Sequence, residues 1–283
     1  MRLRRRAIAA SVCLAALAGT VHAQTPPHSP APATEAPTGR AAVAAELARA
    51  VQNPVADLIS LPLQNNTNFN YGPFGHMQNV LNIQPVVPLH VTPDWNIVTR
   101  TILPVISQPA FVAGEGTTFG LGATQFSTFL SPAKPGAVIW GVGAVAQAPT
   151  ITDKNLGSNI WGGGPTAVAL TMQGPWVIGA LANNIWSAGG NGQNRYNILT
   201  VQPFINYNFG HGTSIGFSPL ITANWEAKSG DQWTVPLGLA LSQVLFLGNQ
   251  PVSLQLGSYY NVVRPDIGPE WQVRFELSFL FPK

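Results

Sequence analysis

Apolar and polar residues alternate most clearly in the last part of the chain, from Trp271 to Lys283. The apolar positions are largely aromatic, and the positions between them are polar and include Arg274 and Glu276. Because successive side chains of a strand point to opposite faces, this period of two predicts a β-strand. Its aromatic face and its place near the end of the chain are typical of the last strand of an outer-membrane barrel.

Weaker alternation, divided by turn-forming residues, extends back to Asp57 and predicts twelve strands. Connections after even-numbered strands are short, as at Gly174-Pro175, whereas those after odd-numbered strands are mostly longer and more charged, as at Thr150 to Gly163. Bacterial outer-membrane barrels likewise combine short periplasmic turns, longer external loops and an even strand number. The predicted strands span residues 57–71, 78–91, 95–106, 117–130, 137–149, 164–173, 176–187, 195–208, 213–226, 232–246, 251–263 and 269–281.

Composition gives two further reasons to place these strands in a membrane. Charged residues make up 9% of the chain, compared with about 25% in soluble domains. The eight tryptophans fall near predicted strand ends, where a membrane–water boundary favours the indole ring. Since a closed barrel satisfies its backbone hydrogen bonds within lipid, the predicted fold is an all-β, transmembrane antiparallel β-barrel of about twelve strands.

The first residues have the organisation of a secretory signal peptide. Four arginines near the start precede the apolar run 7–18, and small residues around Ala23 suit cleavage. We therefore expect residues 1–23 to be removed on export to the bacterial outer membrane, together with the single cysteine, Cys13. Without these arginines the 14 basic residues no longer outnumber the 11 acidic ones, so no nucleic-acid partner is expected.

Residues 24–52 are expected to form a leader before the barrel domain, residues 53–283. The first half of the leader is rich in Pro, Ala and Thr, which is typical of a disordered linker. Its second half places Val43, Leu47 and Val51 on one side of a short amphipathic helix. This helix is either a plug or oligomerisation segment, or a loosely docked leader, and the sequence leaves both interpretations open.

Six prolines lie inside the predicted strands, where a residue without an N–H cannot donate to the ladder. In a closed barrel each of them is expected at a bulge or beside a locally broken pair of strands. They are Pro85, Pro88, Pro104, Pro203, Pro219 and Pro236.

Catalytic motifs are absent from the sequence, and the chain is not expected to be an enzyme. It contains no G-x-S-x-G elbow, no phosphate-binding G-x-x-x-x-G-K and no H-E-x-x-H. The histidines beyond the signal segment are scattered without metal-ligand spacing, so neither a metal nor a cofactor is expected. These histidines are His28, His76, His90 and His211.

Charged residues on the inward side of the strands are the strongest functional candidates. Arg100, Arg274 and Glu276 are all expected to face the lumen. They form either a constriction that filters solutes by charge or an ion pair that braces the interior. Amides and hydroxyls dominate the rest of this side and predict a wet lining, and twelve strands predict a narrow bore. The other candidate pore-lining residues are Gln84, Asn96, Gln202, Asn224, Gln255, Tyr259 and Gln272.

Several phrases of the sequence are distinctive in combination: NPVADLISLPLQNN (53–66), DWNIVTRTILPVI (94–106), ITANWEAKSGDQWTVPLGL (221–239) and FLFP (279–282). Through them the chain resembles a bacterial family of outer-membrane barrels named for the meta-pathway of phenol degradation, often labelled neuromedin U or transporter. The resemblance covers the chain from about residue 53 to its end. It implies an outer-membrane barrel that handles small solutes, aromatic ones among them, and it supplies no catalytic residues.

These patterns together favour an outer-membrane channel for passive passage of small solutes, with hydrophobic or aromatic molecules as candidates. Its expected partners are outer-membrane lipids, the small-molecule solute and the barrel-assembly machinery during insertion. Two alternatives are a barrel enzyme that acts on lipids, which would need adjacent Ser and His side chains facing the lipid, and a structural or adhesion barrel without transport.

Overall fold

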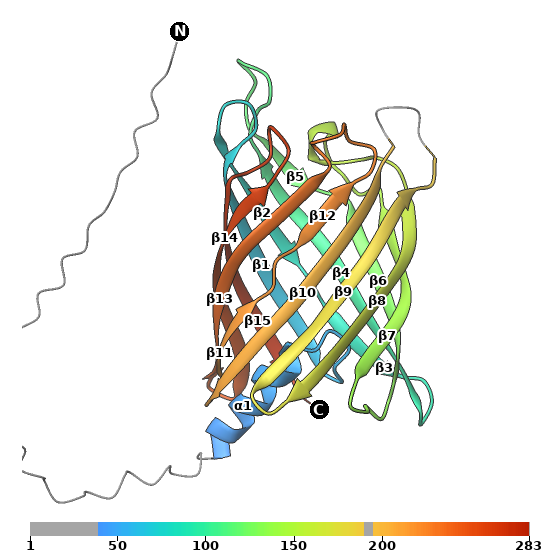
Figure 1. The fold of residues 1–283 in the computed structure, drawn as a ribbon, viewed down its shortest axis with the longest axis vertical. Coiled ribbons are helices and arrows are strands. Elements are labelled where there is room, and N and C mark those ends of the chain that lie inside the picture. The colour runs from blue at the N-terminus through green and yellow to red at the C-terminus, as the bar shows by residue number, and fades with distance from the viewer. Residues whose placement is uncertain (1–38, 190–194, 283) are drawn as a thin grey trace, which may run out of the picture. The chain divides into compact units, whose positions relative to one another are not determined.

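The computed structural model describes residues 39–189 and 195–282. The expected signal segment, residues 1–23, and nearly all of the expected linker lie outside the described residues. Within the described part, strands pair antiparallel with their neighbours around a closed barrel of twelve strands, as the sequence predicts (Figure 1). No helix in this part is long and apolar enough to cross a membrane.

Three of the twelve barrel strands are interrupted, so that fifteen segments are distinguished. The interrupted strands are β2 with β3, β5 with β6, and β11 with β12. In chain order the elements are α1 (Gly39–Val51), β1 (Ile59–Tyr71), β2 (His76–Ile83), β3 (Val86–His90), β4 (Trp95–Gln108), β5 (Thr118–Leu121), β6 (Thr124–Pro132), β7 (Ile139–Ala148), the 3₁₀ turn η1 (Lys154–Leu156), β8 (Gly162–Gln173), β9 (Trp176–Ser187), β10 (Asn197–Gly210), β11 (Thr213–Phe217), β12 (Ile221–Asn224), β13 (Trp233–Leu247), β14 (Gln250–Val263) and β15 (Trp271–Phe281).

The barrel closes where its first strand meets its last. β1 pairs with β15 in one unbroken antiparallel register that runs from Ile59 opposite Phe281 to Phe69 opposite Trp271. The alternating apolar residues of β15 face outward, and Phe275 is 47% exposed. In a closed barrel no strand edge is left unpaired along this seam, which is the condition for placing a sheet in lipid.

The prolines explain where the ladder is interrupted. Pro85 lies in the gap between β2 and β3, and Pro219 lies in the gap between β11 and β12. Pro104 stays within β4 but faces the gap between β5 and β6, where its carbonyl accepts from the Gly122 N–H. Pro88 lies in β3, whose register with β1 extends no further than Val86. Each proline therefore lies where pairing is already interrupted, as expected for a residue that cannot donate.

The widest interruption lies between β11–β12 and β13. The two strands are in register up to Gly216 opposite Ala240 and again from Thr222 opposite Thr234, with no pairing between. Pro203 of β10 and Pro236 of β13 lie at this level, and the register shifts at Pro236. Figure 1 shows the same region as the bend that links β11 and β12 in the wall.

The outer surface carries apolar side chains between two rings of aromatic residues. At the end with the short turns, Trp95 and Trp140 meet edge to face at 6.0 Å. At the end with the long loops, Trp225 meets Trp233 at 5.5 Å and Trp271 lies beside Tyr260. Such rings mark the two membrane–water boundaries of a barrel.

The interior is less polar than the sequence suggests, and the expected wet lining is correct for one side only. On the side of β6, β8, β9 and β10, inward residues form an apolar cluster that includes Phe129, Leu181 and Phe204. Val55, from the segment between α1 and β1, packs into it. Apolar residues on both faces of β6, β8 and β9 hid this cluster, because the inward face of these strands could not be distinguished by hydrophobicity alone.

Helix α1 lies in the short-turn end of the barrel (Figure 1). Ala44, Leu47 and Ala48 are buried against Val244 of β13 and Leu280 of β15. The buried side of the helix therefore differs from the one expected from the sequence, since Val43 of the same helix is 43% exposed. Small alanine side chains let the helix approach the wall closely, and this packing favours the plug interpretation over a loosely docked leader.

Polar contacts fix the end of the helix as well. The Gln52 amide donates to the side chains of Asn208 and Ser214, each at 3.1 Å. Arg49 donates to the carbonyl of Gly174 in the β8–β9 turn. Directly after the helix, the Val55 N–H donates to the Asn53 side chain at 3.0 Å and turns the chain toward β1.

Candidate functional site

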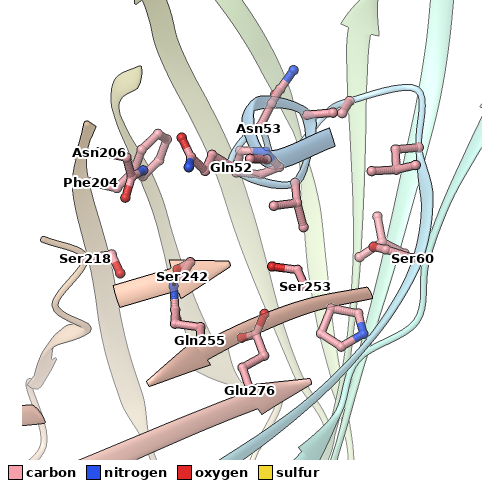
Figure 2. Close-up of a pocket in the computed structure, with 18 of the residues that line it drawn as sticks. Gln52, Asn53, Ser60, Phe204, Asn206, Ser218, Ser242, Ser253, Gln255 and Glu276 are labelled. Carbon is pink, nitrogen blue, oxygen red and sulfur yellow. Dashed lines mark hydrogen bonds between the residues drawn. The ribbon is translucent and has the colours of Figure 1, made fainter. Parts of the chain in front are cut away.

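A cavity of about 200 Å³ lies inside the barrel between the end of α1 and the inward faces of the wall. Figure 2 shows Gln52 and Asn53 on one side of this space and Glu276 on the other. Both arginines predicted from the sequence, Arg100 and Arg274, also line it. The cavity is mixed in character, because hydroxyls and amides share its surface with Val86, Phe204 and Val244.

Arg274 is a buried and fully engaged cation. Its guanidinium donates to the Asn66 side chain at 3.2 Å, to the Gln272 side chain at 3.2 Å and to the Ser218 carbonyl at 3.3 Å. It also lies 4.7 Å from the centre of the Tyr259 ring, a cation–π distance. The Ser218 carbonyl is free to accept because the strand is interrupted there, between β11 and β12. Arg274 therefore donates, from inside the barrel, a hydrogen bond that strand pairing does not supply.

Arg100 has a different environment although it faces the same cavity. Gln84 of the β2–β3 gap is the one described side chain that accepts a hydrogen bond from its guanidinium. A guanidinium has more donors than one amide oxygen can use. Arg100 is thus a half-buried charge that lines the cavity and has more N–H groups than Gln84 can engage.

Glu276 does not complete an ion pair with either arginine. Its carboxylate accepts from the Ser278 hydroxyl at 2.8 Å. Among the described residues the ion pairs are His90–Asp57, Lys134–Asp94 and Arg264–Glu270, and all three lie at the ends of the barrel. The interior is therefore braced by amides around Arg274, and the bracing ion pair considered from the sequence does not form.

The remaining predicted lining residues all lie on inward faces, but they divide into two groups. Gln84, Gln202 and Gln255 line the cavity together with the three charged residues. The others lie elsewhere along the lumen: Gln272 and Tyr259 contact Arg274, Asn96 is buried near the short-turn end, and Asn224 caps the turn after β12 through its contact with the Glu226 N–H.

Sequence reasoning missed the contribution of the segment between α1 and β1. Gln52, Asn53 and Pro54 line the cavity, although nothing in their own alternation marks them as interior. The available signal was the amphipathic helix directly before them, since a helix buried in the barrel end must deliver the following residues into the lumen. Phe204 was missed for a different reason, because it is an apolar residue on a face whose neighbours Gln202 and Asn206 are polar.

The described residues contain no group of three His, Cys, Asp or Glu side chains that could hold a metal ion. His76 begins β2, His90 ends β3 and His211 lies in the turn after β10. The described histidines are thus at strand ends, whereas His28 lies outside the described residues.

Comparison with known proteins identifies the fold. No family model matches the sequence, and no curated protein matches it. Among solved structures, the chain resembles a COG4313 outer membrane channel from Pseudomonas putida F1, with a TM-score of 0.60, 19% identity, and coverage of 79% of this chain and 94% of that one. The phospholipase A barrel of the Escherichia coli outer membrane is more distant, with a TM-score of 0.43, 14% identity, and coverage of 87% and 99%.

The fold and the cavity together define a class of protein: a twelve-stranded barrel of the outer-membrane type with a partly filled lumen. At this level of identity the likeness to the Pseudomonas putida channel concerns the fold.

Proposed function

We propose that this protein is an outer-membrane channel for passive passage of small solutes. The observation that carries the proposal is the cavity inside a closed barrel, lined by Arg100, Arg274, Glu276 and uncharged polar groups. A barrel that served only as a scaffold would have no need to keep charges within its lumen, where each charge has a desolvation cost. The fold shared with an outer membrane channel supports the same function.

The short-turn end, which contains α1, is then periplasmic, and the long loops are external. This assignment goes with export by a cleaved signal at residues 1–23 and with insertion by the barrel-assembly machinery. We propose further that the chain belongs to the family named for phenol degradation, and that hydrophobic or aromatic molecules are among the solutes that pass. Both proposals are supported by the sequence phrases and by the apolar inner wall around Phe204.

The charges of the cavity determine which ions pass most easily. Two arginines and one glutamate leave one excess positive charge in the lumen, so the channel should prefer anions. In a planar bilayer with a potassium chloride gradient, the reversal potential should shift toward the chloride equilibrium potential. Arg100→Gln should remove most of this preference, and Glu276→Gln should strengthen it.

Lys134→Gln is the matched control, because Lys134 lies on a short turn with its side chain 84% exposed. This variant should keep the wild-type reversal potential. A purified barrel that is correctly folded but passes neither ions nor small solutes would contradict the channel function.

The lipid-acting alternative has less support. A hydrolase of the outer leaflet needs a Ser–His pair on the lipid-facing side of the strands, and the described histidines lie at strand ends and in a turn. The likeness to phospholipase barrels is too distant to carry an argument. Release of fatty acid from phospholipid vesicles by the purified protein would overturn our assignment as a non-enzyme.

A further inference from the structure

The unequal environments of the two lumenal arginines indicate which of them meets a ligand. Three hydrogen bonds and the Tyr259 ring hold Arg274. Arg100 is held by Gln84 alone among the described residues, and it lines the cavity with more donors than Gln84 can engage. A half-buried guanidinium with free donors is complementary to an anion, and above all to a planar carboxylate that can accept two parallel hydrogen bonds.

Glu276 does not take this position. No oxygen of its carboxylate lies within 4 Å of Arg100, since the ion pairs of the described residues are elsewhere, and it accepts from Ser278 instead. Glu276 therefore attracts Arg100 only over a longer distance, and no carboxylate of the described residues contacts the guanidinium directly. A solute can supply that direct contact.

The apolar part of the cavity lining indicates what the rest of the solute is. Val86, Phe204 and Val244 provide apolar surface within the same space as Arg100, and Phe204 belongs to the apolar cluster of the inner wall. An inorganic anion would use the guanidinium and leave this surface in contact with water. A molecule with a carboxylate at one end and an apolar body at the other uses both.

Size limits the solute further. The cavity of about 200 Å³ is smaller than the range of about 300–1,000 Å³ that accommodates drug-sized ligands. Gln52 and Asn53 lie along it on the side of the helix. A compact molecule, with a single ring or a short chain beside its carboxylate, matches this volume.

We propose that the cavity is a binding site for small organic carboxylates, with Arg100 as the anion-binding residue and the Phe204 side of the lumen as the apolar contact. The proposal rests on the channel function and names the class of solute that pauses in the lumen during passage. Gln84 positions the guanidinium through its hydrogen bond and does not itself bind the carboxylate.

The test is binding of benzoate to the purified full-length barrel in detergent, measured by saturation-transfer NMR and by isothermal titration. Benzoate should bind saturably, whereas benzyl alcohol, which lacks the carboxylate, and acetate, which lacks the ring, should bind much more weakly. Arg100→Gln should weaken benzoate binding about tenfold or more, because a charge-assisted hydrogen bond is lost. Arg100→Lys, which keeps the charge without the fork, should restore part of it.

Arg195→Gln is the matched control, since Arg195 is an exposed arginine next to β10 at the long-loop end and far from the cavity lining. It should bind benzoate as the wild type does. Heat-dependent migration on a gel verifies that each variant is a folded barrel. Unchanged benzoate binding in Arg100→Gln, or displacement of benzoate by equal concentrations of chloride or phosphate, would overturn the proposal.

The two proposals fail in different ways. A barrel that binds benzoate through Arg100 but is silent in bilayers would contradict the channel function and leave this site in place. A barrel that conducts, with benzoate binding that ignores Arg100, would contradict the carboxylate site and leave the channel in place.

Discussion

The two arginines of the lumen differ in how many hydrogen-bond partners they have, and this difference separates a structural role from a binding role. Arg100 and Arg274 both lie on inward faces and line one cavity. Arg274 is 4% exposed and bridges three acceptors, while Arg100 uses one. The first should therefore matter most for stability, and the second for what the lumen binds.

Arg274→Ala tests this division. It leaves the Ser218 carbonyl and the Gln272 amide oxygen without their donor and the Asn66 oxygen with only a long bond from Gln64, so the free energy of unfolding should fall by about 1–3 kcal/mol. Urea unfolding in lipid vesicles, followed by tryptophan fluorescence, measures the change. Arg100→Ala breaks one contact and should cost clearly less, so equal losses for the two variants would contradict the distinction.

A close backbone contact explains one glycine of β7. A Cβ at Gly143 would lie 1.8 Å from the Thr128 carbonyl oxygen of β6, and backbone atoms cannot move aside as a flexible side chain can. Gly143→Ala should therefore lower the free energy of unfolding by about 1–3 kcal/mol, measured by the same urea titration. At Gly136 the nearest atom lies 4.0 Å away, and Gly136→Ala should leave stability almost unchanged.

At the scale of elements, helix α1 and the segment after it occupy part of the lumen and line one side of its cavity. Leu47 is 6% exposed and packs within the cluster with Val244 and Leu280. Leu47→Asp would bury a carboxylate there, at a cost of several kcal/mol, and should release the helix from the barrel end. Single-channel conductance should rise severalfold, and trypsin should gain access to Arg49.

Val43→Asp gives the matched change on the exposed side of the same helix. It should leave both conductance and cleavage at the wild-type level. Conductance that stays constant in Leu47→Asp, despite a released helix, would show that the restriction lies elsewhere in the lumen.

The twelve strands were predicted correctly, but the inward face of a strand could be predicted only where its two faces differ in polarity. β15 could be predicted in full, because aromatic residues alternate with polar ones from Trp271 onward. The prolines predicted interruptions, but not which strand would break. Pro219 lies within a break, whereas Pro203 stays in a continuous strand and the break occurs in its neighbour.

The candidate site was predictable to a similar extent. Alternation along the strands predicted that Arg100, Arg274 and Glu276 face the lumen, and all three line the cavity. Their partners could not be predicted, because the Ser218 carbonyl becomes available through the gap in the wall. Phe204 and Gln52 join the site through packing between distant segments, and alternation along one strand carries no information about that.

At the scale of the whole molecule, polar and apolar patches share the inner wall of the barrel. Hydrogen-bonded amides and arginines gather on β1, β4 and β15, and the apolar cluster spans β6 and β8 to β10 and includes Val98 of β4. A solute with one charged and one apolar end can be in contact with both patches at once. The proposed preference for organic carboxylates therefore combines the charge of Arg100 with apolar surface from several strands.

The surface against which helix α1 packs has a consequence for assembly of the barrel. Leu280, which the helix contacts, belongs to β15, and the same strand closes the seam with β1. The surface that receives the helix is therefore completed only when β15 joins β1, although Val244 of β13 contributes to it as well. A barrel whose seam has not closed would hold its helix less firmly and expose it more readily to proteases.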